Sequence, residues 1–177
     1  MSVEDFASKA RVFLEANAER KEVKKKFTWG EGTDNVSMFE ERSRDAEMEV
    51  LRKAKEWQAK RFDNGFGWIT GPTEYGGGGL SNAHERAYNQ VEREYRTAPL
   101  GVFQIGLGMV APTILAHASD VAKEKYIRAM WRADIVGCQL FSEPGAGSDL
   151  ASVQAKAERD GDEWLITGQK VWTSGAQ

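Results

Sequence analysis

The stretch Leu140-Phe141-Ser142-Glu143-Pro144-Gly145-Ala146-Gly147-Ser148-Asp149 leads from an apolar run into a turn that is rich in glycine. Pro144 has a restricted φ, whereas Gly145 and Gly147 permit positive φ and close approach to another group. Such a turn can direct successive backbone N–H groups at an anion. The same residues also suit an ordinary Pro-Gly turn between two strands.

Residues after this turn have the pattern of an antiparallel sheet. Apolar and polar side chains alternate, and Asp160-Gly161-Asp162 is a strong hairpin signal because Asp-Gly tolerates positive φ. Gly168-Gln169 predicts a second turn. A sheet of this size leaves its edges unpaired and one face poorly covered, so we expect the β domain to be cut short. The expected strands comprise residues 135–141, 152–158, 164–167 and 170–173.

The beginning of the chain predicts two helices separated by a loop. Apolar residues recur at helical spacing over residues 3–14, and the preceding serine is placed to cap that helix. Residues 27–36 include Gly and Asn residues and predict a loop. Ser37 followed by Glu40 has the spacing of a capping box, in which each side chain bonds the backbone N–H of the other residue. A long charged helix is therefore expected from there to about Arg61.

Residues 63–80 carry glycines and aromatic side chains and have no helical period. The aromatic side chains can pack, so we expect an ordered crossover and not a flexible linker. Four consecutive glycines, Gly76 to Gly79, lack the Gly-Lys-Ser/Thr ending of a P-loop and predict no nucleotide site. A helix is expected next, capped by Ser81 and ending at about Arg96.

The stretch 100–118 is largely apolar and has no Asp, Glu, Lys or Arg. Such a helix is either buried inside a bundle or faces a ligand or another subunit, and Pro112 either starts or kinks it. Ser119 or Asp120 then caps a further amphipathic helix. The expected fold class is α+β, with an all-α helical domain over residues 1–132 and the truncated start of an antiparallel β domain over residues 133–177.

Composition excludes several classes of partner and site. The 177 residues carry a formal net charge of −3 with both signs interspersed, so no basic field indicates nucleic acid. Cys138 is the only cysteine, and His84 and His117 are the only histidines, so neither a disulfide nor a metal cluster is expected. No apolar run is long enough to span a bilayer, and the N-terminus lacks a signal-peptide pattern. A cytoplasmic protein is expected.

Several segments resemble motifs of the acyl-CoA dehydrogenase family. The specific ones are 141–149, Asp160-Gly161-Asp162, Gly168-Gln169-Lys170 and Trp172-Thr173-Ser174-Gly175-Ala176; Pro72-Thr73-Glu74-Tyr75-Gly76-Gly77 and the apolar stretch 106–118 agree less specifically. The resemblance spans essentially the whole chain and covers the family's N-terminal helical domain and the opening of its middle β domain. Family members are longer, and their catalytic glutamate lies in a C-terminal helical domain. We therefore expect the base beyond Gln177 and assign no catalytic residue in this chain.

The resemblance implies FAD as the cofactor and an acyl-CoA thioester as the substrate. Ser148 is expected near the acyl-CoA entrance as well, and Trp172 is expected to pack beside the isoalloxazine. Without the resemblance, Trp172 suits a core tryptophan in a strand and Ser148 a simple helix or turn cap. The residues expected to bind FAD are Gln139, Leu140, Phe141, Ser142, Gly147, Ser148, Trp172, Thr173 and Ser174.

The implied reaction is the α,β-dehydrogenation of an acyl-CoA to the trans-2-enoyl-CoA, in fatty acid β-oxidation or sterol side-chain catabolism. The flavin supplies the redox chemistry, and the protein supplies placement and electrostatics. An electron-transfer flavoprotein or a similar acceptor is expected as a partner, together with a homo- or hetero-oligomer. We expect the isolated fragment to be inactive. One alternative is a non-catalytic helical partner subunit of a heteromeric flavoenzyme, and another is a related acyl-CoA oxidase or flavin monooxygenase.

Overall fold

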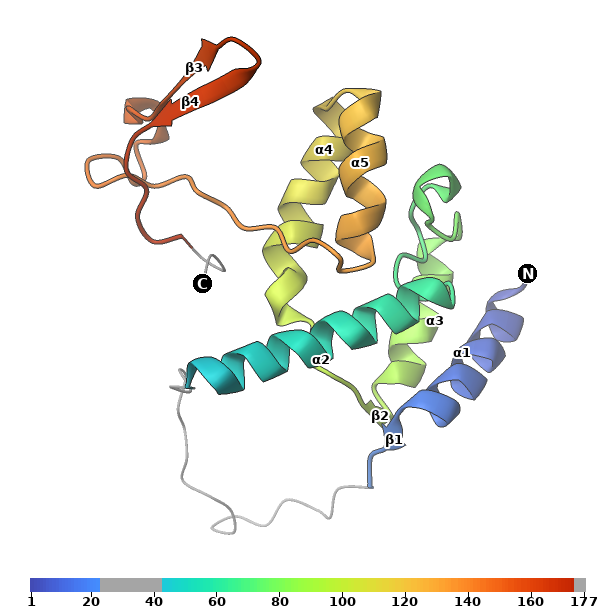
Figure 1. Ribbon diagram of the computed structural model, residues 1–177. Helices are drawn as coiled ribbons and strands as arrows, with labels where there is room; N and C mark the ends of the chain where they lie inside the picture. Colours follow the sequence, from blue (N-terminus) through green and yellow to red (C-terminus); the bar gives the residue numbers. More distant parts are fainter. Residues whose placement is uncertain (23–42, 174–177) are drawn as a thin grey trace. The chain divides into compact units, whose positions relative to one another are not determined.

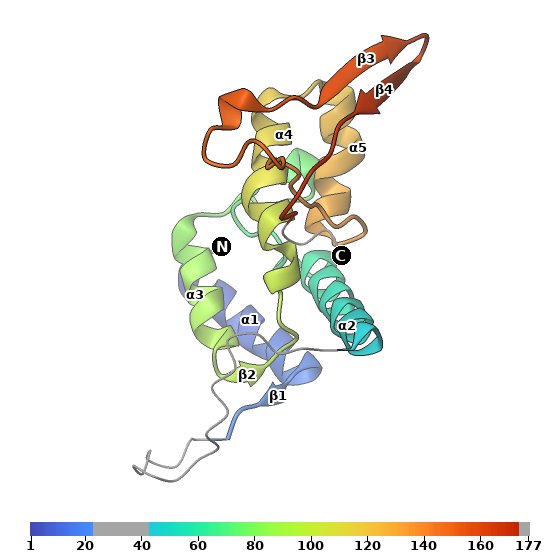
Figure 2. The ribbon, with the colours of Figure 1, turned by 90° about the vertical axis from the view of Figure 1, so that its left-hand side faces the viewer.

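The computed structural model describes residues 1–22 and 43–173, and it confirms the α+β class (Figures 1 and 2). Helices occupy most of the described chain up to Trp131, and an antiparallel hairpin follows near the end. Three expectations lie outside the described residues: the loop at 27–36, the capping pair Ser37 and Glu40, and the flavin contact of Ser174.

The described residues group into two compact units. One comprises Met1–Leu100 with Trp131–Asp134, and the other comprises Gly101–Met130 with the described part of Ile135–Gln177. The second unit therefore contains both helical segments and the hairpin. Because the two units interleave close to residue 132, the domain boundary expected between residues 132 and 133 stays a prediction.

The core of the first unit is rich in aromatic side chains. Helix α1 (Val3–Asn17) packs against α3 (Asn82–Glu92), and α2 (Arg44–Asp63) contributes Trp57, which stacks on Phe13 at a centroid distance of 5.8 Å. As expected, α1 is capped by the serine before it, which accepts from the Asp5 N–H at 3.0 Å. The buried cluster comprises Phe6, Ala10, Phe13, Leu14, Trp57, Phe66, Ile69, Tyr88, Val91 and Tyr95.

A two-residue sheet joins the ends of α1 and α3. Strand β1 (Glu19–Arg20) pairs antiparallel with β2 (Tyr95–Arg96), so the predicted continuation of α3 to about residue 96 is wrong. The carboxylate of Glu94 accepts from Arg11 at 3.0 Å and from Arg20 at 2.8 Å. These ion pairs draw the chain toward α1, where strand pairing satisfies the backbone groups that the helix would otherwise have satisfied.

Ser81 precedes α3, but its side chain does not cap the helix. The hydroxyl instead lies 2.8 Å from Nδ1 of His84, whose other ring nitrogen is 3.2 Å from the carbonyl oxygen of Met1. Ser81 therefore marks the start of the helix as expected, while its hydrogen bond goes to a side chain and not to the backbone.

The crossover between α2 and α3 is ordered, as predicted. Phe66 and Ile69 are buried in the core, and Trp68 stacks on Trp131 at 4.6 Å with an interplanar angle of 6°. The backbone of the crossover folds back on itself through two hydrogen bonds. The Gly78 N–H donates to the Trp68 carbonyl, and the Leu80 N–H donates to the Ile69 carbonyl. The aromatic side chains hold this glycine-rich segment in place.

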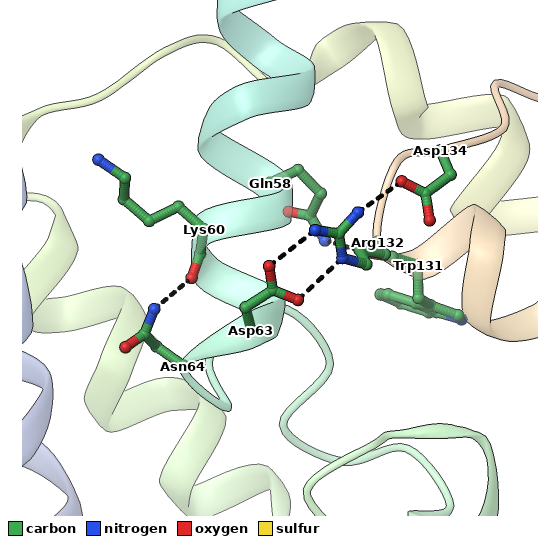
Figure 3. Close-up of polar contacts among 7 residues, drawn as sticks. All are labelled: Gln58, Lys60, Asp63, Asn64, Trp131, Arg132 and Asp134. Atoms are coloured by element: carbon green, nitrogen blue, oxygen red, sulfur yellow. Dashed lines mark hydrogen bonds and ion pairs between the residues drawn. The ribbon is translucent and has the colours of Figure 1, made fainter.

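Polar contacts tie the end of α2 to Arg132 and to Trp131, the last residue of α5 (Asp120–Trp131) (Figure 3). The buried amide of Gln58 donates to the Trp131 carbonyl at 2.7 Å and to a crossover carbonyl at 3.2 Å. The guanidinium of Arg132 forms a two-point ion pair with Asp63, at 2.8 and 2.9 Å. These contacts close the first unit around the Trp68–Trp131 stack.

Pro112 is the second residue of α4 (Ala111–His117), and the backbone before it is already helical, so the predicted start of a helix at this proline is not observed. Helix α4 directly follows a π turn over Gly106–Val110. Pro112 has no N–H to donate to the carbonyl four residues earlier, and the N–H of Ala111 bonds to the carbonyl of Gly106, five residues back. The start of α5 is marked by Ser119, whose hydroxyl accepts from a backbone N–H at 3.4 Å.

The apolar stretch 100–118 is not enclosed within the described part of the chain. Phe103, Gly106 and Ala111 are buried, but Met109 is 44% exposed and the remaining apolar side chains are at most half-buried. The interpretation that this stretch is buried on all sides is not supported among these residues. The alternative, a face for a ligand or another subunit, is kept as a proposal.

The β part consists of one antiparallel hairpin. Strand β3 (Lys156–Asp160) pairs with β4 (Glu163–Thr167), and the register runs from Lys156↔Thr167 to Asp160↔Glu163. The predicted Asp-Gly turn is confirmed, with Gly161 at a φ of 60° in a two-residue loop. Positive φ at the first loop position is where a hairpin turn favours glycine.

The strands predicted at 135–141 and 170–173 are wrong, because neither segment has a ladder of paired residues among the residues that the structure describes. The Val171 N–H donates to the carbonyl of Ser142, the residue that follows the first segment, at 2.9 Å. A strand requires a partner along its length, and an apolar run alone does not supply one.

Candidate functional site

The glycine-rich stretch begins with a closed turn. Glu143 and Ala146 exchange two backbone hydrogen bonds, of 2.9 and 3.1 Å, across Pro144 and Gly145. Neither Gly145 nor Gly147 has a positive φ, and a Cβ on either would meet nothing within 4 Å. The turn is therefore the ordinary Pro-Gly turn, and these glycines do not form the left-handed nest that an anion site would use.

The carboxylate of Glu143 is the best-connected acid of this region. Its side chain is 8% exposed, and it accepts from the N–H groups of Gln154 at 2.7 Å and Ala155 at 2.9 Å. The ammonium of Lys170 lies 2.8 Å from the same carboxylate. Lys170 above all, and then the two backbone N–H groups, lower the pKa of Glu143 to about 2.

Lys170 also joins the turn to the last described residues. Its Nζ donates to the Phe141 carbonyl at 3.0 Å, and the next residue, Val171, donates its N–H to the Ser142 carbonyl at 2.9 Å. Residues 141–143 and 170–171 therefore lie side by side, although they are far apart in the sequence. These bonds bring the two predicted flavin-binding segments together.

Several of the predicted site residues present apolar surface. Leu140 is 51%, Phe141 52% and Trp172 80% exposed. Trp172 is thus no core tryptophan within residues 1–22 and 43–173, and its φ of 52° lies in the left-handed region that residues with a Cβ rarely adopt. Gln139, Ser142 and Thr173 are half-buried, and Gly147 and Ser148 are exposed.

The structure brings Ser142 close to Trp172, because Ser142 is bonded to the residue before it. Gly147 and Ser148 follow the closed turn, and among the described residues no hydrogen bond joins them to residues 170–173. No hydrogen bond of the Ser148 hydroxyl occurs among the described residues, so a simple cap by Ser148 is not observed. Whether these residues contact FAD stays a prediction.

No role was predicted for Glu143 or Lys170, although both lie within the motifs of this region. Their partners lie 11, 12 and 27 residues away along the chain, so no local spacing reveals the contacts. The one sequence signal is a carboxylate two positions after the end of an apolar run, where burial would require charged or hydrogen-bonding partners.

A hollow of about 500 Å³ lies beside the turn, between Pro144-Gly145 and the base of the hairpin at Lys156, Thr167 and Gly168. No group of three potential metal ligands occurs within the described ranges. Over the same ranges, no helix has both the length and the apolar character needed to cross a membrane.

Comparisons with known proteins agree on one family. The family model "Acyl-CoA dehydrogenase, N-terminal domain" matches residues 15–134. Acyl-CoA dehydrogenase IpdE1 of Mycobacterium tuberculosis is 39% identical over 128 residues, which are 72% of this chain and 33% of that relative. Acyl-CoA dehydrogenase FadE34 of the same species is 58% identical over 66 residues, which are 37% of this chain and 9% of FadE34.

Two solved structures share the fold. The Tcur3481-Tcur3483 steroid ACAD has a TM-score of 0.58 at 25% identity and covers 98% of this chain and 40% of its own. The ChsE4-ChsE5 complex from Mycobacterium tuberculosis has a TM-score of 0.58 at 26% identity and covers 97% of this chain and 38% of its own. The chain thus spans about a third of the length of IpdE1 and about 40% of these solved chains. Since the family model matches most of its residues, the chain belongs to the acyl-CoA dehydrogenase family.

Proposed function

We propose that this chain supplies part of the FAD and acyl-CoA site of a dehydrogenase that converts an acyl-CoA thioester to the trans-2-enoyl-CoA. The observation that carries the proposal is the hydrogen bond from Val171 to Ser142, which brings together the two segments with flavin-site motifs. The names of IpdE1 and FadE34, both acyl-CoA dehydrogenases, support the reaction. An electron-transfer flavoprotein or a similar acceptor is the proposed electron partner.

The exposed side chains fit a flavin. Phe141 and Trp172 offer flat apolar surface, which a protein normally buries, next to the half-buried hydroxyl of Ser142. The open space around Gly147 leaves the backbone accessible to a phosphate. When bound, FAD supplies a ring that accepts hydride, and these residues would hold and orient it. Gln139, Leu140, Ser148, Thr173 and Ser174 belong to the same proposed site.

No residue of this chain is proposed as the base. A general base works best with a pKa near the operating pH. The carboxylate of Glu143, with its pKa of about 2, is held ionised by three donors and is a poor proton acceptor. We therefore propose that the base comes from outside these 177 residues.

The proposed substrate is a CoA ester from lipid or sterol side-chain catabolism. The support is the Tcur3481-Tcur3483 enzyme, which has the same fold and is named a steroid ACAD. Competition between fatty acyl-CoA and steroid acyl-CoA esters for the purified holoenzyme would measure this preference directly.

FAD binding tests the proposed site. We expect FAD to quench the fluorescence of the protein, and we expect this quenching to fall in Trp172→Phe. The matched control is Trp164→Phe, an exposed tryptophan of β4 that is outside the proposed site. Equal quenching in both variants would contradict the proposal. With FAD and an artificial electron acceptor, we expect no acyl-CoA oxidation by the isolated chain, and turnover would show that the base lies within it.

A non-catalytic partner subunit is the second candidate. It is favoured by the exposed apolar side chains of the stretch 100–118, Met109 among them, and by the solved complex of ChsE4 with ChsE5. Light scattering on a mixture with a full-length acyl-CoA dehydrogenase would detect a heteromer as a mass increase. Unchanged masses on mixing would argue against this candidate.

A further inference from the structure

We infer that Glu143 and Lys170 are positioning residues that lock the two flavin-binding segments into one geometry. The inference rests on the proposed function, because it assigns these residues a role toward the proposed FAD site. Neither side chain is needed to contact the flavin or the substrate. Their role is to fix the backbone next to the residues that do.

Three separate pieces of chain meet at the carboxylate of Glu143. Glu143 belongs to the closed turn, Gln154 and Ala155 lead into β3, and Lys170 follows β4. Both carboxylate oxygens are occupied, one by Gln154 and the other by Ala155 and Lys170. Hydrogen bonds to an ionised acceptor are shorter and stronger than neutral ones, so this arrangement is more rigid than an ordinary turn.

These bonds lie next to the proposed flavin contacts in both segments. Phe141 and Ser142 directly precede Glu143, and Trp172 follows Lys170 by two residues. Lys170 reaches both segments at once, since its ammonium contacts the carboxylate of Glu143 and the carbonyl oxygen of Phe141. The bond between Val171 and Ser142 lies immediately beyond it.

The backbone of Trp172 has a strained conformation. A φ of 52° is unfavourable for a side chain with a Cβ, and with 80% exposure the indole gains little packing within the described chain. Strained residues persist where their surroundings fix them, and they gather at ligand sites. The two bonds of Lys170 and the one bond of Val171 hold the chain just before this strained residue.

The test compares Glu143→Gln with Glu163→Gln, the same change at an exposed position at the start of β4. The carboxylate of Glu143 accepts hydrogen bonds through both of its oxygens. A glutamine has only one acceptor oxygen, and its NH₂ group would face a donor. Amide hydrogen exchange at Gln154, Ala155 and Val171 should become about tenfold faster in Glu143→Gln only, as loss of a charge-assisted hydrogen bond predicts. Unchanged exchange at Val171 would overturn the coupling between the segments.

The flavin readouts separate positioning from a purely structural role. In Glu143→Gln we expect the dissociation constant of FAD to rise roughly tenfold and the visible circular dichroism of bound flavin to change, while Glu163→Gln retains both values. Faster exchange with unchanged FAD affinity and dichroism would mean that the contact stabilises only the fold, which overturns the inference.

Lys170→Gln provides a second route if Glu143→Gln does not fold. If both single variants fold, a double-mutant cycle should show strong non-additivity in FAD affinity, because each substitution removes the same contact. Additive effects would contradict the pair. If the unsubstituted protein does not bind FAD, the proposed function fails, and the exchange rates at Val171 in Lys170→Gln still decide whether the segments are coupled.

Discussion

Ala133 combines two properties that seldom occur together in a residue with a Cβ. It follows α5 with a φ of 69°, and its side chain is almost fully buried. The left-handed region costs a residue with a Cβ about 1–2 kcal/mol, which is why glycine usually occupies this place after a helix. The backbone of the first unit therefore stores strain at this residue.

We expect Ala133→Gly to be neutral or to raise the free energy of unfolding by up to about 1 kcal/mol, because relief of strain outweighs the greater freedom of the unfolded chain. Ala133→Val should lower it, since a β-branched side chain tolerates this conformation still less. Urea denaturation of both variants checks the prediction. A loss in Ala133→Gly equal to that in Ala133→Val would show that backbone strain is not the cause.

Gly71 is required because no space is left for a side chain at this position. A Cβ on Gly71 would overlap the ring of Trp68, which stacks on Trp131. We expect Gly71→Ala to lower the free energy of unfolding by about 1–3 kcal/mol, the usual cost of overpacking. The near-ultraviolet circular dichroism of the tryptophan pair should also change. Gly101→Ala is the control, because a Cβ there meets nothing within 4 Å.

At the scale of elements, two kinds of polar contact of unequal worth surround Trp131 and Arg132 (Figure 3). The buried amide of Gln58 satisfies the carbonyl oxygens of Trp131 and Gly67, whereas Arg132 pairs with the exposed carboxylate of Asp134 at 2.7 Å. Unsatisfied buried carbonyls cost about 1–3 kcal/mol, and exposed ion pairs contribute about 0–1 kcal/mol. The amide is therefore the dominant contact.

We expect Gln58→Leu to lower the free energy of unfolding by about 1–3 kcal/mol and Asp134→Asn by less than about 1 kcal/mol. Added salt should reduce the effect of Asp134→Asn and leave that of Gln58→Leu unchanged, because only the ion pair is screened. Chemical denaturation at low and high salt measures both effects. A larger loss in Asp134→Asn would reverse the ranking.

At the scale of the whole molecule, the sequence predicted elements whose signals are local. The capped helix at residues 3–14 and the turn at Gly161 were both visible in short windows. Features that depend on distant partners were not. The pairing of β1 with β2 and the contacts of Glu143 join positions far apart, and the apolar run at 135–141 carried no information about a partner strand.

The same distinction applies to the candidate site. Motif resemblance predicts that Ser142 and Trp172 contact the flavin, and the structure brings their segments together. The motifs did not predict that Lys170 links these segments, because a lysine at the start of a predicted strand has the appearance of a surface charge. Burial of its carboxylate partner is a tertiary property, which arises only when three segments meet.

The pH dependence of stability provides a test on the molecule as a whole. The pKa of Glu143 falls from its ordinary value of 4.5 to about 2 in the folded protein, mainly through Lys170. Between these values the unfolded state binds more protons than the folded state, so stability must fall as the pH is lowered. The contribution is fully present above about pH 4.5 and is lost as the pH falls to about 2.

We therefore expect the melting temperature to decrease between pH 4.5 and pH 2, and to decrease less in Glu143→Gln, which has no proton to gain at this position. The contribution of Glu49 must be separated from that of Glu143, because Arg52 and then Lys53 lower the pKa of Glu49 to about 2 as well. Glu49 is exposed on α2, so high salt should abolish the difference between Glu49→Gln and the unsubstituted protein. The partly enclosed Glu143 contact should keep its effect in salt, and parallel melting curves for Glu143→Gln and the unsubstituted protein would refute its role.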